Sequence, residues 1–217
     1  MQVRLISYTV PCTDLQQEGL QSAEDVIIHN ARVSNPANQL NVDTGARLIK
    51  YCVDHQHWSI FEQAFMTVEI KTSRAVAAQI LRHRSFTFQE FSQRYSVAHD
   101  IEHYELRRQA EKNRQSSSDV IWDNENGVFD VAANAINVAH EAYSKLIELG
   151  VARESARMIL PLTTQTTMYM SGSCRSFMHY VDLRTKEDTQ KEHREIAHAV
   201  RDVFKQVFPM VSAAKNY

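Results

Sequence analysis

Hydrophobic and polar residues alternate along this chain with two different periods. The period of two is clearest over 61–72, where Val68 and Ile70 flank the polar Glu69, and it predicts a strand with one face in solvent. Two further segments have strand character, at residues 2–10 and 165–173. We expect these strands to form a small, mostly antiparallel sheet.

A helical spacing of apolar residues covers more of the chain than the strand pattern does. Helices are expected over 16–32, 42–56, 73–84, 127–149, 151–160, 174–184 and 189–208. Ser73 is a typical N-cap residue, and Gly150 is typical of the position after a helix end. Residues 107–126 are charged and rich in serine, which favours a surface loop or a partly ordered insertion. The chain is therefore predicted to form one helix-rich α+β domain over residues 1–217.

Composition narrows the function classes. A net charge of −2 over 217 residues argues against a generic nucleic-acid-binding protein, which carries a basic excess. No apolar run approaches about 18 residues, so no membrane span is expected, and the first residues lack the zones of a signal peptide. The three cysteines form no CxxC pair, which favours the cytoplasm and neither a disulfide framework nor a zinc site. No glycine belongs to a GxGxxG or GxxxxGK motif, so neither a Rossmann turn nor a P-loop is expected.

The most unusual segment of the chain is the window at 82–94, RHRSFTFQEFSQR. It contains three arginines, no lysine and interspersed phenylalanines. Arginine without lysine favours bidentate recognition of phosphate or stacking on a conjugated ring. In a structural alternative, Arg82, His83 and Arg84 occupy the last turn of the helix at 73–84, where the helix dipole favours cations. The residues that follow contain no Gly, Pro or Asn to mark an ordinary turn, which favours a binding role.

Other segments carry groups that suit the same site, although each is a weak signal alone. Arg153 and Arg157 lie four residues apart on one helix face. Ordinary pairing with an acidic neighbour is the alternative for Arg153, whereas Arg157 lies in the apolar run ARMIL and is expected to point into an enclosed site. His55 and His57 have no partner at metal-ligand spacing, so no metal site is expected.

Several of these motifs resemble those of the flavin-dependent thymidylate synthase family. The window resembles the signature RHRxxSxxxxSxR, with Thr87 at the first serine. HWSIFE resembles the family's HxxPFE segment, with Ile60 at the proline position. GVARESARMILPL resembles a family helix that leads into a Leu-Pro pair. SCRSFMHYVDLR resembles NxRSLxxFLxLR, with Ser173 and His179 where asparagine is usual. The matching segments keep the family's order from about residue 42 to 205.

The resemblance implies the fold of that family and the reductive methylation of dUMP to dTMP. Methylenetetrahydrofolate is the implied carbon donor, and FAD reduced by NADPH is the implied hydride carrier. It also implies a homotetramer with active sites at subunit interfaces and no nucleic-acid or membrane partner. The implied location is the cytoplasm, or the host cytoplasm if a virus encodes the chain.

The resemblance also assigns roles to individual residues. The residues implied for FAD are Ser59, Arg82, His83, Arg84, Glu90, Ser173, Arg175 and His179. The residues implied for dUMP are Gln79, Arg82, Glu90, Phe91, Ser92, Gln93, Arg94, Arg157 and Arg184. Catalytic roles fall to His57, which is associated with the flavin step, and to Arg184. Because a guanidinium stays protonated at neutral pH, we expect Arg184 to stabilise the ionised N3–O4 edge of uracil rather than to act as a base.

Two alternatives come from other function classes. One is a single-stranded nucleic-acid-binding module that uses the arginines of the window with Phe86, Phe88 and Phe91 as stacking platforms. The other is a flavoprotein of similar fold that does not transfer a methyl group. A purified protein that is yellow, is reduced by NADPH and forms dTMP supports a flavin-dependent thymidylate synthase and excludes both alternatives.

Overall fold

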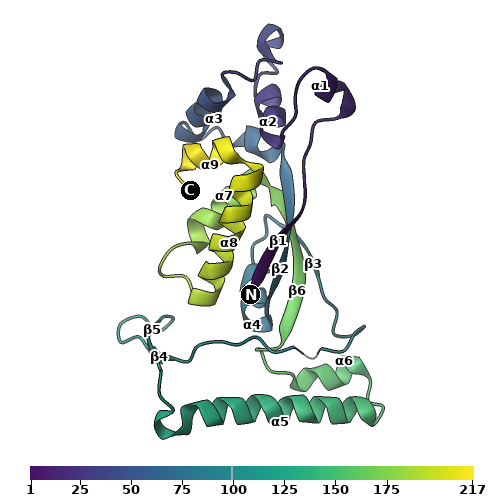
Figure 1. Ribbon diagram of the computed structural model, residues 1–217, viewed down its shortest axis with the longest axis vertical. Coiled ribbons are helices and arrows are strands. Elements are labelled where there is room, and N and C mark those ends of the chain that lie inside the picture. The colour runs from purple at the N-terminus through teal and green to yellow at the C-terminus, as the bar shows by residue number, and fades with distance from the viewer. Residues whose placement is uncertain (99) are drawn as a thin grey trace.

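The computed structural model describes residues 1–98 and 100–217, and within these ranges a four-stranded sheet forms its centre (Figure 1). The strand order is β1-β2-β6-β3, and all neighbours are antiparallel. The strands are β1 (Gln2–Tyr8), β2 (Phe65–Ser73), β6 (Gln165–Ser173) and β3 (Thr87–Glu90). The expected helix-rich α+β fold with a small antiparallel sheet is confirmed.

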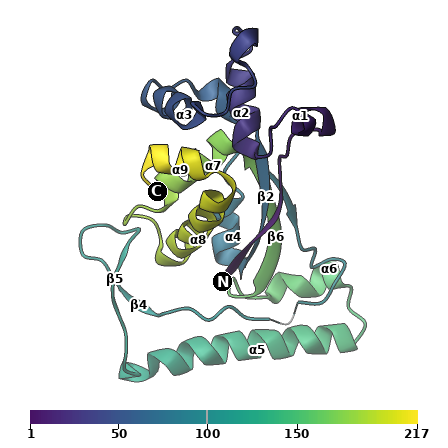
Figure 2. The ribbon, with the colours of Figure 1, turned by 45° about the horizontal axis from the view of Figure 1, so that its top comes forward.

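The core lies between this sheet and the helices α7 (Cys174–Arg184) and α8 (Lys191–Val207), which pack together on one face (Figures 1 and 2). Val68 of β2 lies opposite Met170 of β6, and both side chains are fully buried. Phe204 of α8 is also fully buried, as its helical spacing predicts. Two sequence periods therefore meet in one core, because each places its apolar residues on a single face.

The other helices are shorter or lie at the edges of the molecule. They are α1 (Thr13–Gln17), α2 (Ala23–Ala31), α3 (Gly45–Asp54), α4 (Arg74–Ile80), α5 (Val128–Glu148), α6 (Arg153–Ala156) and α9 (Pro209–Lys215). Short 3₁₀ turns are η1 (Pro36–Asn38), η2 (Trp58–Glu62), η3 (Glu125–Gly127) and η4 (Arg157–Ile159). No described helix is long and apolar enough to cross a membrane.

The prediction of one helix over 16–32 is wrong because α1 ends at Gln17 and α2 begins at Ala23. Gly19 has a φ of 102°, which no helix continues. Ser22 then starts α2 with a capping box, in which its side chain accepts from the backbone N–H of Asp25.

The helix predicted over 73–84 is shorter than expected, and this excludes the structural alternative for the cations. Ser73 does cap α4, but the helix ends at Ile80. The backbone N–H of His83 bonds the carbonyl of Ile80 in a turn beyond the helix. Arg82, His83 and Arg84 are therefore not last-turn cations.

The helix predicted over 151–160 is also divided. It ends as α6 at Ala156 and continues as η4, and Leu160 is extended with ψ at 135°. Pro161 explains this end, since the residue before a proline is disfavoured in a helix. The strand predicted over 61–72 starts later, at Phe65, because η2 occupies the preceding residues.

Four strands and helices of the described structure were not predicted from the sequence pattern: β3, β4 (Arg107–Gln109), β5 (Ser117–Val120) and α9. The insertion at 107–126 contains a hairpin of β4 and β5, so it is a partly ordered insertion rather than a plain loop. Within the arginine window, β3 pairs with β6. Helix α9 follows α8 and begins at Pro209.

Helix α5 lies apart from the sheet, at the bottom of Figure 1, with α6 above its end. Of its described residues, Tyr143 alone is buried. The predicted helix end is confirmed at Gly150, whose φ of 80° suits glycine after a helix.

Candidate functional site

The start of the window meets the end of α7 at a contact between His83 and Arg184. Nε of Arg184 donates to Nε2 of His83 over 2.9 Å, and the imidazole packs edge-on against Tyr180 with ring centroids 5.0 Å apart. Burial, followed by the nearby charges of Arg184 and His179, lowers the pKa of His83 from its ordinary value of 6.5 to about 4. His83 is therefore neutral near pH 7 and carries its proton on Nδ1, because Nε2 accepts.

A second group of polar contacts forms where η2 meets the start of α7. Ser173 caps α7 by accepting from the backbone N–H of Ser176, and its hydroxyl donates to Glu62 over 2.5 Å. Arg175 bonds the other carboxylate oxygen of Glu62 over 3.1 Å. Glu62 therefore ties the segment after His57 to α7.

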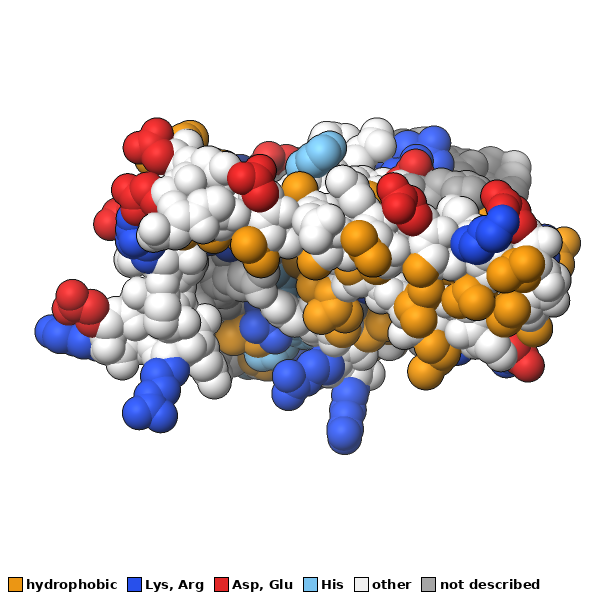
Figure 3. Space-filling view, turned by 90° about the horizontal axis from the view of Figure 1, so that it is seen from below, with side chains coloured by type: hydrophobic (Ala, Val, Ile, Leu, Met, Phe, Trp, Pro, Cys, Tyr) orange, Lys and Arg blue, Asp and Glu red, His pale blue; other side chains and the backbone are white. Residues whose placement is uncertain are grey.

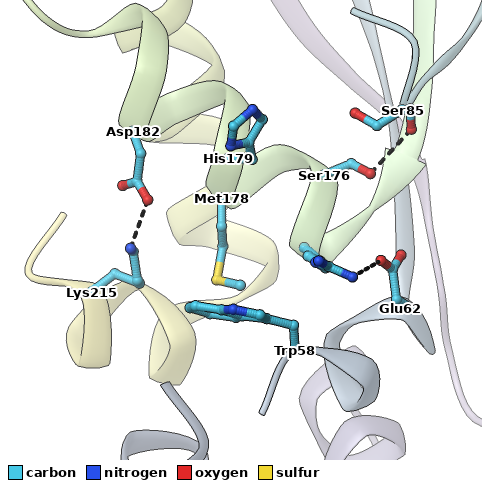
Figure 4. Close-up of a pocket in the computed structure, with 9 residues that line it drawn as sticks. Trp58, Glu62, Ser85, Ser176, Met178, His179, Asp182 and Lys215 are labelled. Atoms are coloured by element: carbon cyan, nitrogen blue, oxygen red, sulfur yellow. Dashed lines mark hydrogen bonds and ion pairs between the residues drawn. The ribbon is translucent and has the colours of Figure 1, made fainter. Parts of the chain in front are cut away.

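A cavity of about 500 Å³ opens beside these contacts (Figure 4). Figure 4 shows the flat indole of Trp58 below Met178, with His179 above Met178. Lys215 of α9 borders the cavity and is paired with Asp182 over 2.7 Å. The remaining lining residues are Glu62, Ser85, Arg175 and Ser176. A flat apolar wall with cations nearby suits a planar ring that carries anionic groups.

Hydrogen bonds from Arg74 and Thr166 fix the middle of the window. Arg74 donates to the carboxylate of Glu90 and to the carbonyl of Phe91, each over 2.9 Å. The hydroxyl of Thr166 also donates to Glu90 over 2.9 Å. These bonds fix the backbone where β3 ends and the turn to Arg94 begins.

The end of the window lies against α6. Arg94 pairs with Glu154 over 3.0 Å, and Arg153 donates to the carbonyl of Tyr95 over 2.7 Å. Arg153 is thus bonded to the turn after the window rather than to Glu154. Nε of Arg157 lies 3.4 Å from the carbonyl of Glu154, and its side chain is half-buried.

Gln93 is the buried polar residue of this turn. Its side-chain amide nitrogen has no hydrogen-bond partner among the residues that the structure describes. Ser92 and Arg94 border a hollow of about 650 Å³ that α6 closes on the other side.

The residues implied by the resemblance thus form three groups in this chain. Arg175 and His179 line the cavity at η2, and Ser173 bonds Glu62, which also lines it. Gln79 contacts His193, whose ring lies edge-on to His83, the partner of Arg184. The third group is the turn against α6, with Ser92, Gln93, Arg94 and Arg157. Exposed positions are occupied by His57, Ser59, Arg82 and Arg84.

Comparisons with known proteins identify the family of this chain. The profile of the thymidylate synthase complementing protein family matches residues 14–210. The chain is 50% identical to a flavin-dependent thymidylate synthase of Synechocystis sp. and 48% identical to a probable flavin-dependent thymidylate synthase of Paramecium bursaria Chlorella virus 1, with 100% of each chain covered. This chain belongs to the flavin-dependent thymidylate synthase family.

A solved structure shares the fold of this family member. The UMP/dUMP methylase PolB from Streptomyces cacaoi, bound with 5-Br UMP, superimposes with a TM-score of 0.82 at 25% identity. The superposition covers 99% of this chain and 93% of that one. The resemblance stated from the sequence is confirmed at the level of family and fold.

Sequence motifs missed several residues that border or support these groups. Trp58 and Lys215 line the cavity, Arg74 holds Glu90, and His193 contacts Gln79. Trp58 lies inside the HxxPFE-like segment, so the segment pointed to it without indicating its role. Lys215, Arg74 and His193 belong to no quoted motif, and packing alone brings them to the site.

Proposed function

We propose that this chain methylates dUMP at C5 to form dTMP, with methylenetetrahydrofolate as carbon donor and FAD reduced by NADPH as hydride source. The observation that carries the proposal is the contact between His83 and Arg184. It joins the signature window to the last arginine of the NxRSLxxFLxLR-like segment, within a chain whose family is known.

FAD is the group that the cavity at η2 fits by its chemistry. Trp58 offers a flat apolar face and His179 a hydrogen-bonding ring. Arg175 and Lys215 are cations held in place by Glu62 and Asp182, and their remaining N–H groups are the donors available to a ligand. Ser173 and Glu62 hold this corner in place. When bound, FAD supplies the hydride chemistry, and the side chains of the cavity bind and orient it.

Arg184 is suited to the electrostatic role expected of it. Its Nε donates to His83, whereas no hydrogen bond of its two Nη groups is seen to the described residues. A guanidinium fixed on one side presents its other edge in a defined direction. We infer that this edge stabilises negative charge on N3 and O4 of uracil, which makes C5 nucleophilic.

The turn against α6 is suited to the phosphate of dUMP. Arg94 and Arg157 supply positive charge, and the buried amide nitrogen of Gln93 has an unused donor within the described structure. An unpaired buried donor is costly unless a ligand accepts from it. Ser92 adds an exposed hydroxyl at the same turn.

A homotetramer with shared active sites is part of the proposal. Val131 and Val138 of helix α5 are 70% and 55% exposed, and Leu149 directly after it is 68% exposed. Figure 3 shows hydrophobic side chains along this face of the molecule. A helix of 21 residues with one buried side chain among those described lacks the packing that stabilises helices in monomers. The division of the implied residues into three groups is expected when a partner subunit completes each site.

Purified protein tests the proposal directly. The expected protein binds FAD, its oxidised-flavin absorbance bleaches with NADPH, and it forms dTMP from dUMP and methylenetetrahydrofolate. A protein that binds no FAD overturns the proposal and favours the nucleic-acid alternative. Reduction without dTMP favours a flavoprotein that lacks methyl transfer. Light scattering after size exclusion gives the subunit number independently of activity.

A further inference from the structure

A continuous series of hydrogen bonds runs from the insertion to the core of the molecule. Arg107, the first residue of β4, pairs with Glu192 of α8 over 2.7 Å, and both side chains are nearly buried. Burial opposes ionisation of Glu192, but hydrogen bonds from Gln190, from its own backbone and from Arg107 outweigh it and hold its pKa below the usual value. Glu192 is therefore a carboxylate near neutral pH and can only accept hydrogen bonds.

This carboxylate fixes the orientation of two amides. Gln190 lies 2.8 Å from Glu192 and must donate through Nε2, so its carbonyl oxygen faces the other way. That oxygen lies 2.6 Å from Nε2 of Gln79, which must donate in turn. The carbonyl oxygen of Gln79 then faces Nδ1 of His193 over 3.2 Å.

The same logic assigns the tautomer of His193. Its Nδ1 must carry a proton, because it faces a carbonyl oxygen. His193 is fully buried, and burial, followed by the charges of Arg184 and His83, lowers its pKa to about 3. The neutral ring has a bare Nε2, which accepts from the hydroxyl of Tyr180 over 3.2 Å.

We propose that the Arg107–Glu192 pair sets the orientation of the Gln79 side-chain amide by way of Gln190. In this orientation Gln79 donates a hydrogen bond to its ligand, and the buried His193 bonds the side-chain carbonyl of Gln79. The Gln79 carbonyl is occupied by His193 and one amide hydrogen by Gln190. The second amide hydrogen is the group that Gln79 offers to a ligand. Gln79 therefore recognises an acceptor oxygen of the bound nucleotide, a step that rests on the proposed function.

The insertion gains a role in this arrangement. Its first strand supplies Arg107, which is also bonded to Glu105 over 3.3 Å. Glu192 and His193 are positioning residues, since they act through Gln190 and Gln79 rather than by touching the substrate.

The tautomer of His193 is measurable without any activity. We expect ¹⁵N NMR of the ligand-free protein to show His193 protonated at Nδ1 and bare at Nε2. Tyr180→Phe should keep this tautomer, because Glu192 sets the direction of every hydrogen bond from Gln190 to His193. Glu192→Gln should populate both tautomers, because its amide both donates and accepts. Protonation at Nε2 in the wild type, or a tautomer change in Tyr180→Phe but not in Glu192→Gln, overturns the proposal.

Kinetics test the consequence for the nucleotide in protein that forms dTMP. His193→Leu should raise KM for dUMP about 3- to 10-fold, the range of one hydrogen bond, with kcat within about twofold. His193→Asn should restore KM to within about twofold, because its amide nitrogen takes the place of Nδ1. An unchanged KM in a folded His193→Leu variant, or equal losses in both variants, overturns the proposal. If the wild-type protein forms no dTMP, the proposed function is contradicted. The NMR experiment then still tests the orientation of the Gln79 amide, because it needs no activity.

Discussion

Nε of Arg184 donates a hydrogen bond to Nε2 of His83 over 2.9 Å. The two residues lie 101 positions apart, one in the arginine window and one at the end of α7. Because His83 is buried and neutral, the contact orients the guanidinium without cancelling its charge. The following predictions start from this contact and the packing around it.

Arg184→Lys should lower kcat for dTMP formation by about 100-fold, the cost of one well-placed donor to a developing anion. Lysine keeps the charge but lacks the planar fork, so it cannot bond His83 and face uracil together. Steady-state kinetics and FAD titration measure the effect, and FAD affinity should change little. Arg4→Lys is the matched control, since Arg4 is exposed and pairs with Glu69 at the sheet edge. Near-normal turnover of Arg184→Lys contradicts the role.

Arg74→Met should destabilise the protein by about 1–3 kcal/mol and raise KM for dUMP, because Glu90 and the carbonyl of Phe91 lose their shared donor. Urea denaturation gives the free energy of unfolding. Arg4→Met removes a more exposed pair and should cost at most about 1 kcal/mol. Equal losses for the two variants show that the bonds of Arg74 do not fix the turn.

Gly172→Ala should destabilise the fold by about 1–3 kcal/mol through overpacking. A Cβ at Gly172 falls 2.5 Å from Cδ1 of Phe86, and that ring packs against Phe177 with centroids 4.8 Å apart. Combining Gly172→Ala with Phe86→Leu should give a smaller loss than the sum of the two, because they share one space. Additive free energies of unfolding argue against this steric account.

Stability should fall as the pH drops from about 6.5 to about 4. The folded pKa of His83 is about 4 and that of His193 about 3, against an ordinary value of 6.5. The unfolded chain therefore binds protons first, and each histidine removes roughly 1.4 kcal/mol per pH unit within its window. Urea midpoints at pH 7, 6 and 5 measure the slope. His193→Asn should flatten it, and parallel slopes for the two proteins contradict the shift.

Local pattern was sufficient for much of the fold. The strand at 165–173 and the helix at 174–184 have the bounds that their periods predict. Local signals failed where backbone geometry or pairing decided the outcome. Gly19 divided one predicted helix, and β3 became a strand by pairing with β6. A four-residue strand has too few residues to show its period without a partner.

For the candidate site as well, some features follow from the sequence and others only from the tertiary structure. The sequence by itself determined the family, the arginine window and the order of the motifs, because these depend on which residues occur at which spacing. The tertiary structure alone decided which side chains meet: Arg184 with His83, and His193 with Gln79 across 114 positions. It also decided the directions of the hydrogen bonds, since these follow from a carboxylate that packing buries beside Arg107. Spacing cannot specify such directions, because a donor is defined only by the acceptor that the fold places opposite it.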